Sequence, residues 1–173
     1  LSARDFEQIA GLVGDITGIK LPQGKLLMVE GRLRKRIRAL GHASIDHYCS
    51  WLFGQGGLEL ELPHLIDAVT TNKTDFFREP QHYAFLAKTA VPGLIADRKG
   101  YNPLIKVWSA ACSNGAEAFS AAMVLDDLQR QRQDFHYAIL GTDVSTSMLN
   151  QACRAIYPAD WMEPVSRGFQ NRY

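Results

Sequence analysis

The sequence lacks several features that would assign it quickly to a class of protein. None of its apolar runs approaches the roughly 20 residues that cross a membrane, and its start, LSARDFEQ, has no basic segment followed by an apolar core. Its 3 cysteines lie far apart in the chain, which excludes both a paired disulfide framework and a Cys-x-x-Cys metal site. We therefore expect a cytoplasmic protein that holds no metal and does not insert into a membrane.

An excess of charge of one sign is also missing. The 19 lysines and arginines and the 18 aspartates and glutamates give a formal net charge of +1, which argues against a globally basic protein that binds nucleic acid. The positive charges gather between Lys25 and Arg38. A solvated helix face is the commoner explanation for such a local excess of positive charge, and a binding surface is the other.

The first 70 residues have the apolar spacing of helices. We expect one helix over about 2–17 and another over about 24–40, each followed by a glycine. A third begins near Ser44, and a fourth carries the apolar residues of 58–69. The apolar stripes of the first two helices consist of Phe6, Ile9, Val13, Ile16, Leu26, Val29, Leu33, Ile37 and Leu40. Residues 1–70 are thus predicted to form a small all-helical bundle.

The pattern changes after residue 72. A helix is expected from about Pro80, with a break or kink at Pro92. The apolar run 105–111 then predicts a buried parallel strand. A glycine-containing loop, a helix over about 116–130 and a second strand at 136–142 follow. This order of strand, loop, helix and strand is that of a βαβ unit in a parallel sheet.

Two residues of this unit stand where ligands bind in open α/β sheets, beyond the carboxyl ends of the strands. Gly115 follows the first strand and would let backbone approach a ligand closely, and Asp143 ends the second strand, where a carboxylate can accept hydrogen bonds from ribose hydroxyls. A complete G-x-G-x-x-G is absent, which weakens a dinucleotide interpretation. An ordinary strand-end turn with a helix-capping Asp143 explains these two residues equally well.

The segment 70–79, TTNKTDFFRE, is unusual for a simple connection between a helical bundle and an α/β unit. It closely resembles the signature of the bacterial chemotaxis-receptor methyltransferases, the CheR family of protein-glutamate O-methyltransferases. The similarity continues, in the family's order, through FFREPQHYAFL, VWSAACSNGAEAFSAAM, GTDVS and ACRAIY. We therefore suspect membership of this family over nearly the whole chain.

The resemblance implies an N-terminal all-α helical bundle followed by a Rossmann-like class I methyltransferase domain of the α/β class. Residues 1–70 would form the helical substrate-recognition domain, 71–78 an interdomain segment that contacts the cofactor, and 79–173 the first part of the cofactor-binding domain. The methyltransferase domain is expected to be incomplete, with its C-terminal strands missing. A sheet without those strands exposes edges and apolar faces, so the fragment is expected to self-associate or swap segments.

The resemblance also implies an activity, namely methyl transfer from S-adenosylmethionine to glutamate side chains of chemotaxis receptors, with S-adenosylhomocysteine as the other product. Arg78 is the candidate catalytic residue. The cofactor-binding candidates carried over from the family are Asn72, Thr74, Arg78, Gly115, Glu117 and Asp143. A structural arginine that pairs with Glu79 or a helix end is the alternative for Arg78.

Receptor recognition is assigned, by the same resemblance, to the basic helix. Its candidate residues for binding the acidic cytoplasmic helices of the receptors are Lys25, Arg32, Lys35, Arg36 and Arg38. The glycine loop departs from the family's usual CSTGEEPYS, since it reads CSNGAEAFS here. A truncated or degenerate relative that binds receptors or cofactor without catalysis therefore remains the alternative function.

Overall fold

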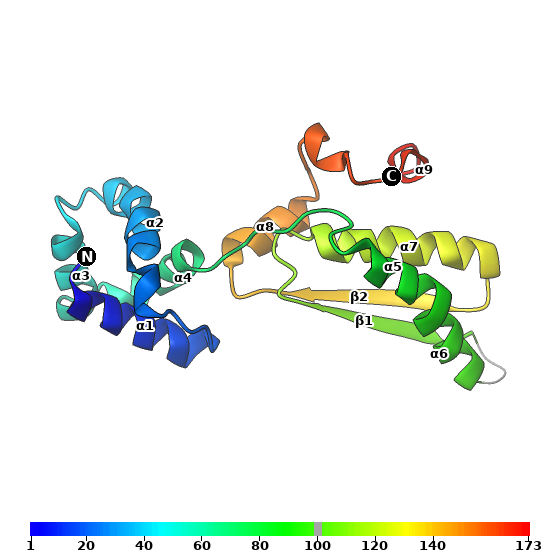
Figure 1. Ribbon diagram of the computed structural model, residues 1–173, viewed down its shortest axis with the longest axis horizontal. Helices are drawn as coiled ribbons and strands as arrows, with labels where there is room; N and C mark the ends of the chain where they lie inside the picture. Colours follow the sequence, from blue (N-terminus) through cyan, green and yellow to red (C-terminus); the bar gives the residue numbers. More distant parts are fainter. Residues whose placement is uncertain (99–101) are drawn as a thin grey trace. The chain divides into compact units, whose positions relative to one another are not determined.

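The computed structural model describes residues 1–98 and 102–173 of the chain. These residues form two compact units, which are described separately. The first unit comprises Leu1–Thr71 and Val144–Thr146, and the second comprises Asn72–Asp143 and Ser147–Tyr173. Figure 1 shows that the first unit is helical and that the second contains the strands. The predicted division into 1–70, 71–78 and 79–173 remains a prediction.

Local capping signals set the ends of the helices in the first unit. Helix α1 (Ala3–Thr17) begins after Ser2, whose hydroxyl accepts from the Asp5 amide, and ends at Gly18, which adopts a left-handed conformation with φ 74°. A 3-10 turn (Gln23–Lys25) leads into α2 (Leu26–Ala39). Helix α3 (Ile45–Gly54) is capped by Ser44, and α4 (Leu58–Val69) contains Pro63. The predicted bundle is confirmed.

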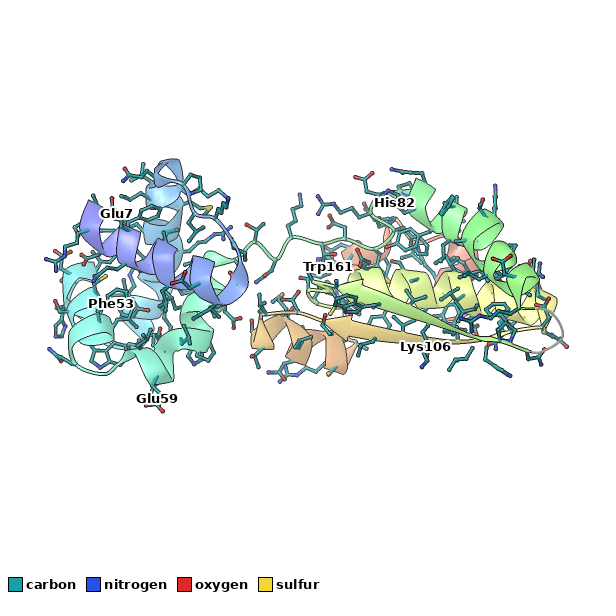
Figure 2. The ribbon with its side chains drawn as sticks, turned by 90° about the horizontal axis from the view of Figure 1, so that it is seen from below. Glu7, Phe53, Glu59, His82, Lys106 and Trp161 are labelled. Carbon is teal, nitrogen blue, oxygen red and sulfur yellow. The ribbon has the colours of Figure 1, made fainter. Side chains whose placement is uncertain are left out.

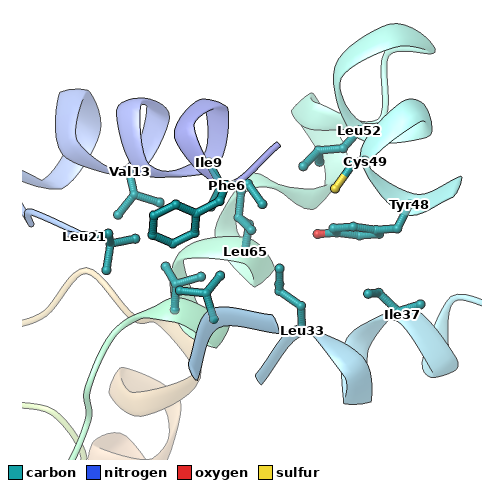
Figure 3. Close-up of a cluster of buried hydrophobic side chains, with 12 residues drawn as sticks. Phe6, Ile9, Val13, Leu21, Leu33, Ile37, Tyr48, Cys49, Leu52 and Leu65 are labelled. Carbon is teal, nitrogen blue, oxygen red and sulfur yellow. The ribbon is translucent and has the colours of Figure 1, made fainter. Parts of the chain in front are cut away.

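The core of the first unit lies between these four helices, and Figure 3 shows its buried side chains. Its members are Phe6, Ile9, Val13, Leu21, Val29, Leu33, Ile37, Tyr48, Cys49, Leu52, Leu65 and Val69. Three residues of the predicted stripes are not members of it, and of these Leu26 is partly buried and packs against it. Ile16 is 49% exposed and Leu40 is 37% exposed, since each lies at or beyond the last turn of its helix.

The second unit is built on two parallel strands, β1 (Leu104–Ala110) and β2 (His136–Thr142), with Leu104 opposite His136 in the register. Helix α7 (Ala116–Arg132) connects them. Strand β1 starts and stops one residue earlier than predicted, because Ala111 has a φ of 61° and so leaves the extended conformation. The predicted βαβ unit is otherwise confirmed.

The helical segment before β1 contains one wider, π-helical turn. Helix α5 (Pro80–Phe85) passes into a π-helical turn (Leu86–Ala90) and then into α6 (Val91–Asp97). Pro92 has no amide hydrogen, so the normal helical hydrogen bond cannot form there. The predicted break at Pro92 thus takes the form of a local widening immediately before it, and the helical path continues.

Only one face of the sheet is covered by the described residues. Val91 of α6 and Leu125 of α7 pack with Ile105 of β1. On the opposite face Trp108 is 68% exposed and Leu140 is 62% exposed. Strand β1, predicted as a buried strand, is therefore buried on one face only, and its other face has the exposed apolar side chains expected of a sheet without its neighbouring strands.

The chain after β2 forms short helical pieces. These are α8 (Thr146–Arg154), a 3-10 turn (Ala159–Met162) and α9 (Arg167–Gln170). Phe169 stacks on Phe77 with ring centroids 5.7 Å apart, and Arg172 pairs with Asp127 of α7. No helix within residues 1–98 and 102–173 is both long and apolar enough to cross a membrane.

Candidate functional site

The loop between β1 and α7 is held in an unusual backbone conformation. Ala111, Ser113 and Gly115 all have positive φ, at 61°, 51° and 91°, and such values in non-glycine residues need support from their surroundings. One support is the Cys112 amide, which donates to the Thr142 carbonyl at 2.9 Å. Another is the Ser113 amide, which donates to Asp143 Oδ2 at 2.7 Å. The loop is thereby fixed to the end of β2.

Ser113 also joins this loop to the segment that precedes α5. Its hydroxyl donates to the main-chain carbonyl of Asn72 at 2.9 Å. Asn72, the loop and Asp143 are thus brought together at the carboxyl ends of the two strands, where open α/β sheets bind their ligands. Asp143 was expected either to stabilise a strand-end turn or to bind a ligand. Its carboxylate does stabilise the turn, through the Ser113 amide, and it lies beside the predicted ligand site.

Glu117 lies in the first turn of α7, where the helix dipole favours negative charge. Its Oε1 accepts a hydrogen bond from the Ser109 hydroxyl at 2.6 Å. Ser109 belongs to the covered face of β1 and is buried. This contact ties the exposed carboxylate of Glu117 to the strand that precedes the loop.

The segment Asn72–Arg78 ends in a second strained stretch. Phe77 and Glu79, the neighbours of Arg78, have φ values of 51° and 57°. The Phe77 amide donates to the hydroxyl of buried Ser120 on α7 at 2.9 Å. Arg78 is exposed, and its Nη1 donates within the segment to the Lys73 carbonyl at 3.1 Å. Thr74 is partly buried in the same segment.

Gly115 is required by packing as well as by conformation. An added Cβ would meet Phe119 at 2.9 Å, Ala152 at 3.0 Å and the Tyr157 hydroxyl oxygen at 3.1 Å. Its φ of 91° is also one that residues with a Cβ rarely adopt. This internal packing explains a glycine at the position, and its predicted role beside the cofactor remains a prediction.

The altered glycine loop keeps a capping function. Asn114, which stands where the family usually has threonine, accepts from the Ala116 amide through Oδ1 at 3.1 Å. Its carbonyl accepts from the Tyr157 hydroxyl at 2.6 Å, and burial raises the pKa of Tyr157 to about 12. The substitution therefore leaves the start of α7 stabilised.

Three serines took no part in the sequence-based prediction of the site, namely Ser109, Ser113 and Ser120. They contact Glu117, the pair Asn72 and Asp143, and Phe77, respectively. Small hydroxyl residues clustered around a glycine loop were the available signal, because serine readily bonds local backbone. Their partners are 8 to 43 positions away in the chain, so the sequence alone could not pair them.

The basic residues predicted to bind receptors fall into two groups, those that bind groups of the first unit and those that are exposed. Arg36 binds Glu61 with two hydrogen bonds, from Nε to Oε1 at 2.8 Å and from Nη2 to Oε2 at 2.7 Å. Glu61 is 1% exposed and also accepts from the Tyr48 hydroxyl at 3.1 Å. The hydrogen bonds to Glu61 raise the pKa of Arg36, and burial raises that of Tyr48.

Arg32 is the other residue of the predicted set that binds groups of the first unit. Its Nη1 donates to the carbonyls of Val69 at 3.0 Å and Thr70 at 2.7 Å, where α4 ends. A cation at this position satisfies carbonyls that a helix leaves unpaired. Lys25, Lys35 and Arg38 are exposed. The predicted receptor-binding set thus consists of three outward side chains and two that have structural partners.

The described residues contain no group of three or more histidine, cysteine, aspartate or glutamate side chains placed to hold a metal ion. The polar groups at the site are carboxylates, serine hydroxyls and main-chain amides. Such groups suit the hydroxyls and ammonium of a nucleoside-type cofactor.

An all-α unit followed by a parallel βαβ unit, with a carboxylate anchoring the glycine loop, is typical of an all-α domain joined to an α/β domain of the Rossmann-like class. The family comparison makes this specific. The family model described as "CheR methyltransferase, SAM binding domain" matches residues 72–173, and "CheR methyltransferase, all-alpha domain" matches residues 4–70. The chain belongs to the CheR methyltransferase family.

Several curated relatives named chemotaxis protein methyltransferase are similar to the chain. That of Borreliella burgdorferi is 35% identical over 158 residues, which are 90% of this chain and 56% of the relative. Those of Salmonella typhimurium and Escherichia coli are 34% and 33% identical over 173 residues, which are 100% of this chain and 57% of each relative. The chain spans about half the length of the curated relatives it matches.

Proposed function

We propose that the protein transfers a methyl group from S-adenosylmethionine to glutamate carboxylates in the cytoplasmic helices of chemotaxis receptors. The products are glutamate methyl esters and S-adenosylhomocysteine. The observation that carries the proposal is the hydrogen-bonded junction of Asn72, Ser113 and Asp143 at the ends of the strands, in a region matched by the family's cofactor-binding domain. The names of the relatives support the receptor as substrate.

The candidate cofactor residues have the chemistry that this ligand needs. Asp143 can accept hydrogen bonds from ribose hydroxyls, because a carboxylate has acceptor sites beyond the one taken by the Ser113 amide. Glu117 can pair with the ammonium group of the methionine part, and Arg78 with its carboxylate. Asn72 and Thr74 contribute polar groups from the same segment as Arg78, and Gly115 keeps the loop compact.

The chemistry places few demands on acid–base groups. S-adenosylmethionine supplies a methyl group on a positively charged sulfur, and a glutamate side chain is already ionised at neutral pH. No general base is needed to generate the nucleophile. The protein's contribution is to align the receptor carboxylate and to exclude water around it. Arg78, exposed and next to the cofactor residues in the chain, is the proposed group for steering that carboxylate.

The proposed receptor-binding surface consists of Lys35 and Arg38 on α2 and of Lys25 in the turn that leads into it. These exposed cations would attract acidic receptor helices and speed their encounter with the enzyme. Arg32 and Arg36, also in the predicted set, would support this surface through Val69, Thr70 and Glu61. We place the reaction in the cytoplasm, where receptor methylation sites are accessible.

The test is a methyl-transfer assay with labelled cofactor and receptor fragments, using the protein expressed from its complete coding sequence. Arg78→Ala should lower the maximal rate by about 100-fold, as expected for loss of a charged contact to the reacting carboxylate. Arg38→Glu should instead raise the receptor KM, most strongly at low salt. Arg4→Ala, an exposed change on α1, is the matched control and should leave both constants unchanged.

A binding module without catalysis is the alternative, and the changed glycine loop is the feature that favours it. In that case the wild-type protein would bind receptor fragments or cofactor and yet label no glutamate. Absence of labelling with intact cofactor binding would therefore reject the enzyme and leave the binding module.

A further inference from the structure

Two serine hydroxyls meet the segment Asn72–Arg78 at its two ends. Ser113 Oγ donates to the Asn72 carbonyl at 2.9 Å, and Ser120 Oγ accepts from the Phe77 amide at 2.9 Å. Ser113 is 6% exposed and Ser120 is 0% exposed. Both serines lie in the part of the second unit that follows β1, so each bond spans more than 40 positions of the chain.

The Ser120 hydroxyl both donates and accepts a hydrogen bond. Its hydroxyl hydrogen goes to the Ala116 carbonyl at 2.7 Å, and its oxygen receives the Phe77 amide. Phe77 has a φ of 51°, a conformation that a bulky side chain adopts only when its surroundings hold it. The Phe77 amide, next to Arg78, therefore depends on one buried hydroxyl group for its hydrogen bond.

The contact at Ser113 links three parts of the site. Its hydroxyl binds Asn72 and its amide binds Asp143 at 2.7 Å. A ligand that reorients Asp143 would act through Ser113 on the main chain of Asn72. The two predicted cofactor residues farthest apart in sequence, Asn72 and Asp143, are thus connected through Ser113.

We propose that Ser113 and Ser120 are positioning residues, which fix the segment Asn72–Arg78 to the glycine loop and to α7 and so place Arg78 for methyl transfer. This rests on the proposed function for its consequence in catalysis. The hydrogen bonds themselves are independent of it. Removal of either hydroxyl takes one hydrogen bond away from the main chain of the segment, and the segment gains freedom that Arg78 shares.

The direct readout is hydrogen–deuterium exchange at the Phe77 amide, measured together with methyl transfer in the protein expressed from its complete coding sequence. Ser120→Ala should accelerate this exchange by about tenfold, which corresponds to the loss of about 1.4 kcal/mol. The maximal transfer rate should fall by a similar factor, with the receptor KM unchanged. Ser120→Thr retains a hydroxyl and should restore part of both.

Ser113→Ala is the second variant and guards against a folding defect at buried Ser120. It keeps the amide bond to Asp143 and loses only the hydroxyl bond to Asn72. We expect a lower maximal rate with an unchanged receptor KM, and a smaller loss of melting temperature than in Ser120→Ala. Ser50→Ala, an exposed serine on α3, is the control that should alter nothing.

The outcomes separate this inference from the proposed function. Wild-type exchange at Phe77 in Ser120→Ala, or wild-type transfer rates in both alanine variants, would overturn the positioning role. A wild-type protein that transfers no methyl group would instead reject the proposed function. The anchoring of the segment would then be decided by the exchange rates alone.

Discussion

The two units of the chain differ in how completely they enclose their apolar residues. In the first unit, residues from all four helices form one core, and Phe6, Ile9, Leu33 and Tyr48 are at most 1% exposed. In the second unit, the sheet is covered on one face, while Trp108 and Leu140 lie more than half exposed on the other. Lys106 of β1, which is labelled in Figure 2, is also exposed.

This difference indicates which buried residues stabilise a helical core and which hold the candidate site in place. The first unit gains its stability from packing and from the buried Arg36–Glu61 pair. The second unit devotes its buried polar groups to the loop and the segment that form the candidate site, such as Ser113 and Ser120. Substitutions at packed residues are therefore expected to change stability in both units, and changes in ligand binding are expected mainly from the second.

The largest effect is expected from breaking the buried ion pair. Arg36→Ala leaves Glu61 charged and buried without its main partner, and should lower the free energy of unfolding of the first unit by about 3–5 kcal/mol. Denaturant unfolding followed by circular dichroism measures this loss. A loss in receptor binding without any loss in stability would instead support Arg36 as a docking residue.

Two further variants sharpen that result. Arg34 pairs with Glu30 on the surface, so Arg34→Ala should have little effect on unfolding. The double change Arg36→Met with Glu61→Leu replaces the pair by apolar side chains and should restore most of the stability lost in Arg36→Ala.

The next effect concerns the glycine loop of the second unit. Gly115→Ala forces an added Cβ against Phe119, Ala152 and Tyr157 and into an unfavourable φ, and should cost about 2–4 kcal/mol. Gly11→Ala in α1 is the matched control, because nothing lies within 4 Å of its added Cβ. It should stabilise the first unit by about 0.5–1 kcal/mol. Equal effects at the two glycines in thermal unfolding would contradict the packing described for the loop.

The smallest effect is expected from the open sheet face, through which we propose that the chain self-associates. Leu140→Lys places a charge on this face and should weaken association by about tenfold in sedimentation velocity. Leu60→Lys, at a leucine 79% exposed on α4, should not. A wild-type chain that stays monomeric at every concentration would reject self-association.

Much of the fold could be predicted from the sequence because its signals are local. Ser2, Gly18 and Ser44 act as helix caps at the positions expected, and strand β2 has the predicted bounds. The exposure of Ile16 could not be predicted, because burial depends on which distant elements cover a side chain. The π-helical turn before Pro92 depends likewise on how the chain accommodates a missing amide.

The site was predictable only in part. Gly115 and Asp143 follow from their places after the two strands, and Glu117 was implied by the family resemblance. Ser113 and Ser120 do not, since their partners are more than 40 positions away. The charge of α2 indicated a basic surface, but the sequence could not separate outward Arg38 from Arg36, whose partner Glu61 lies 25 positions further on.

The central claim is that the second unit binds S-adenosylmethionine through the carboxylate at the end of β2, and calorimetric titration of this cofactor tests it most directly. The wild-type protein should bind one molecule per chain, and Asp143→Asn should weaken binding by about 10- to 100-fold. Asp134→Asn, an exposed acid paired with Arg132, should bind like the wild type. A wild-type protein that does not bind the cofactor, or an Asp143→Asn variant that binds it equally well, would contradict the claim.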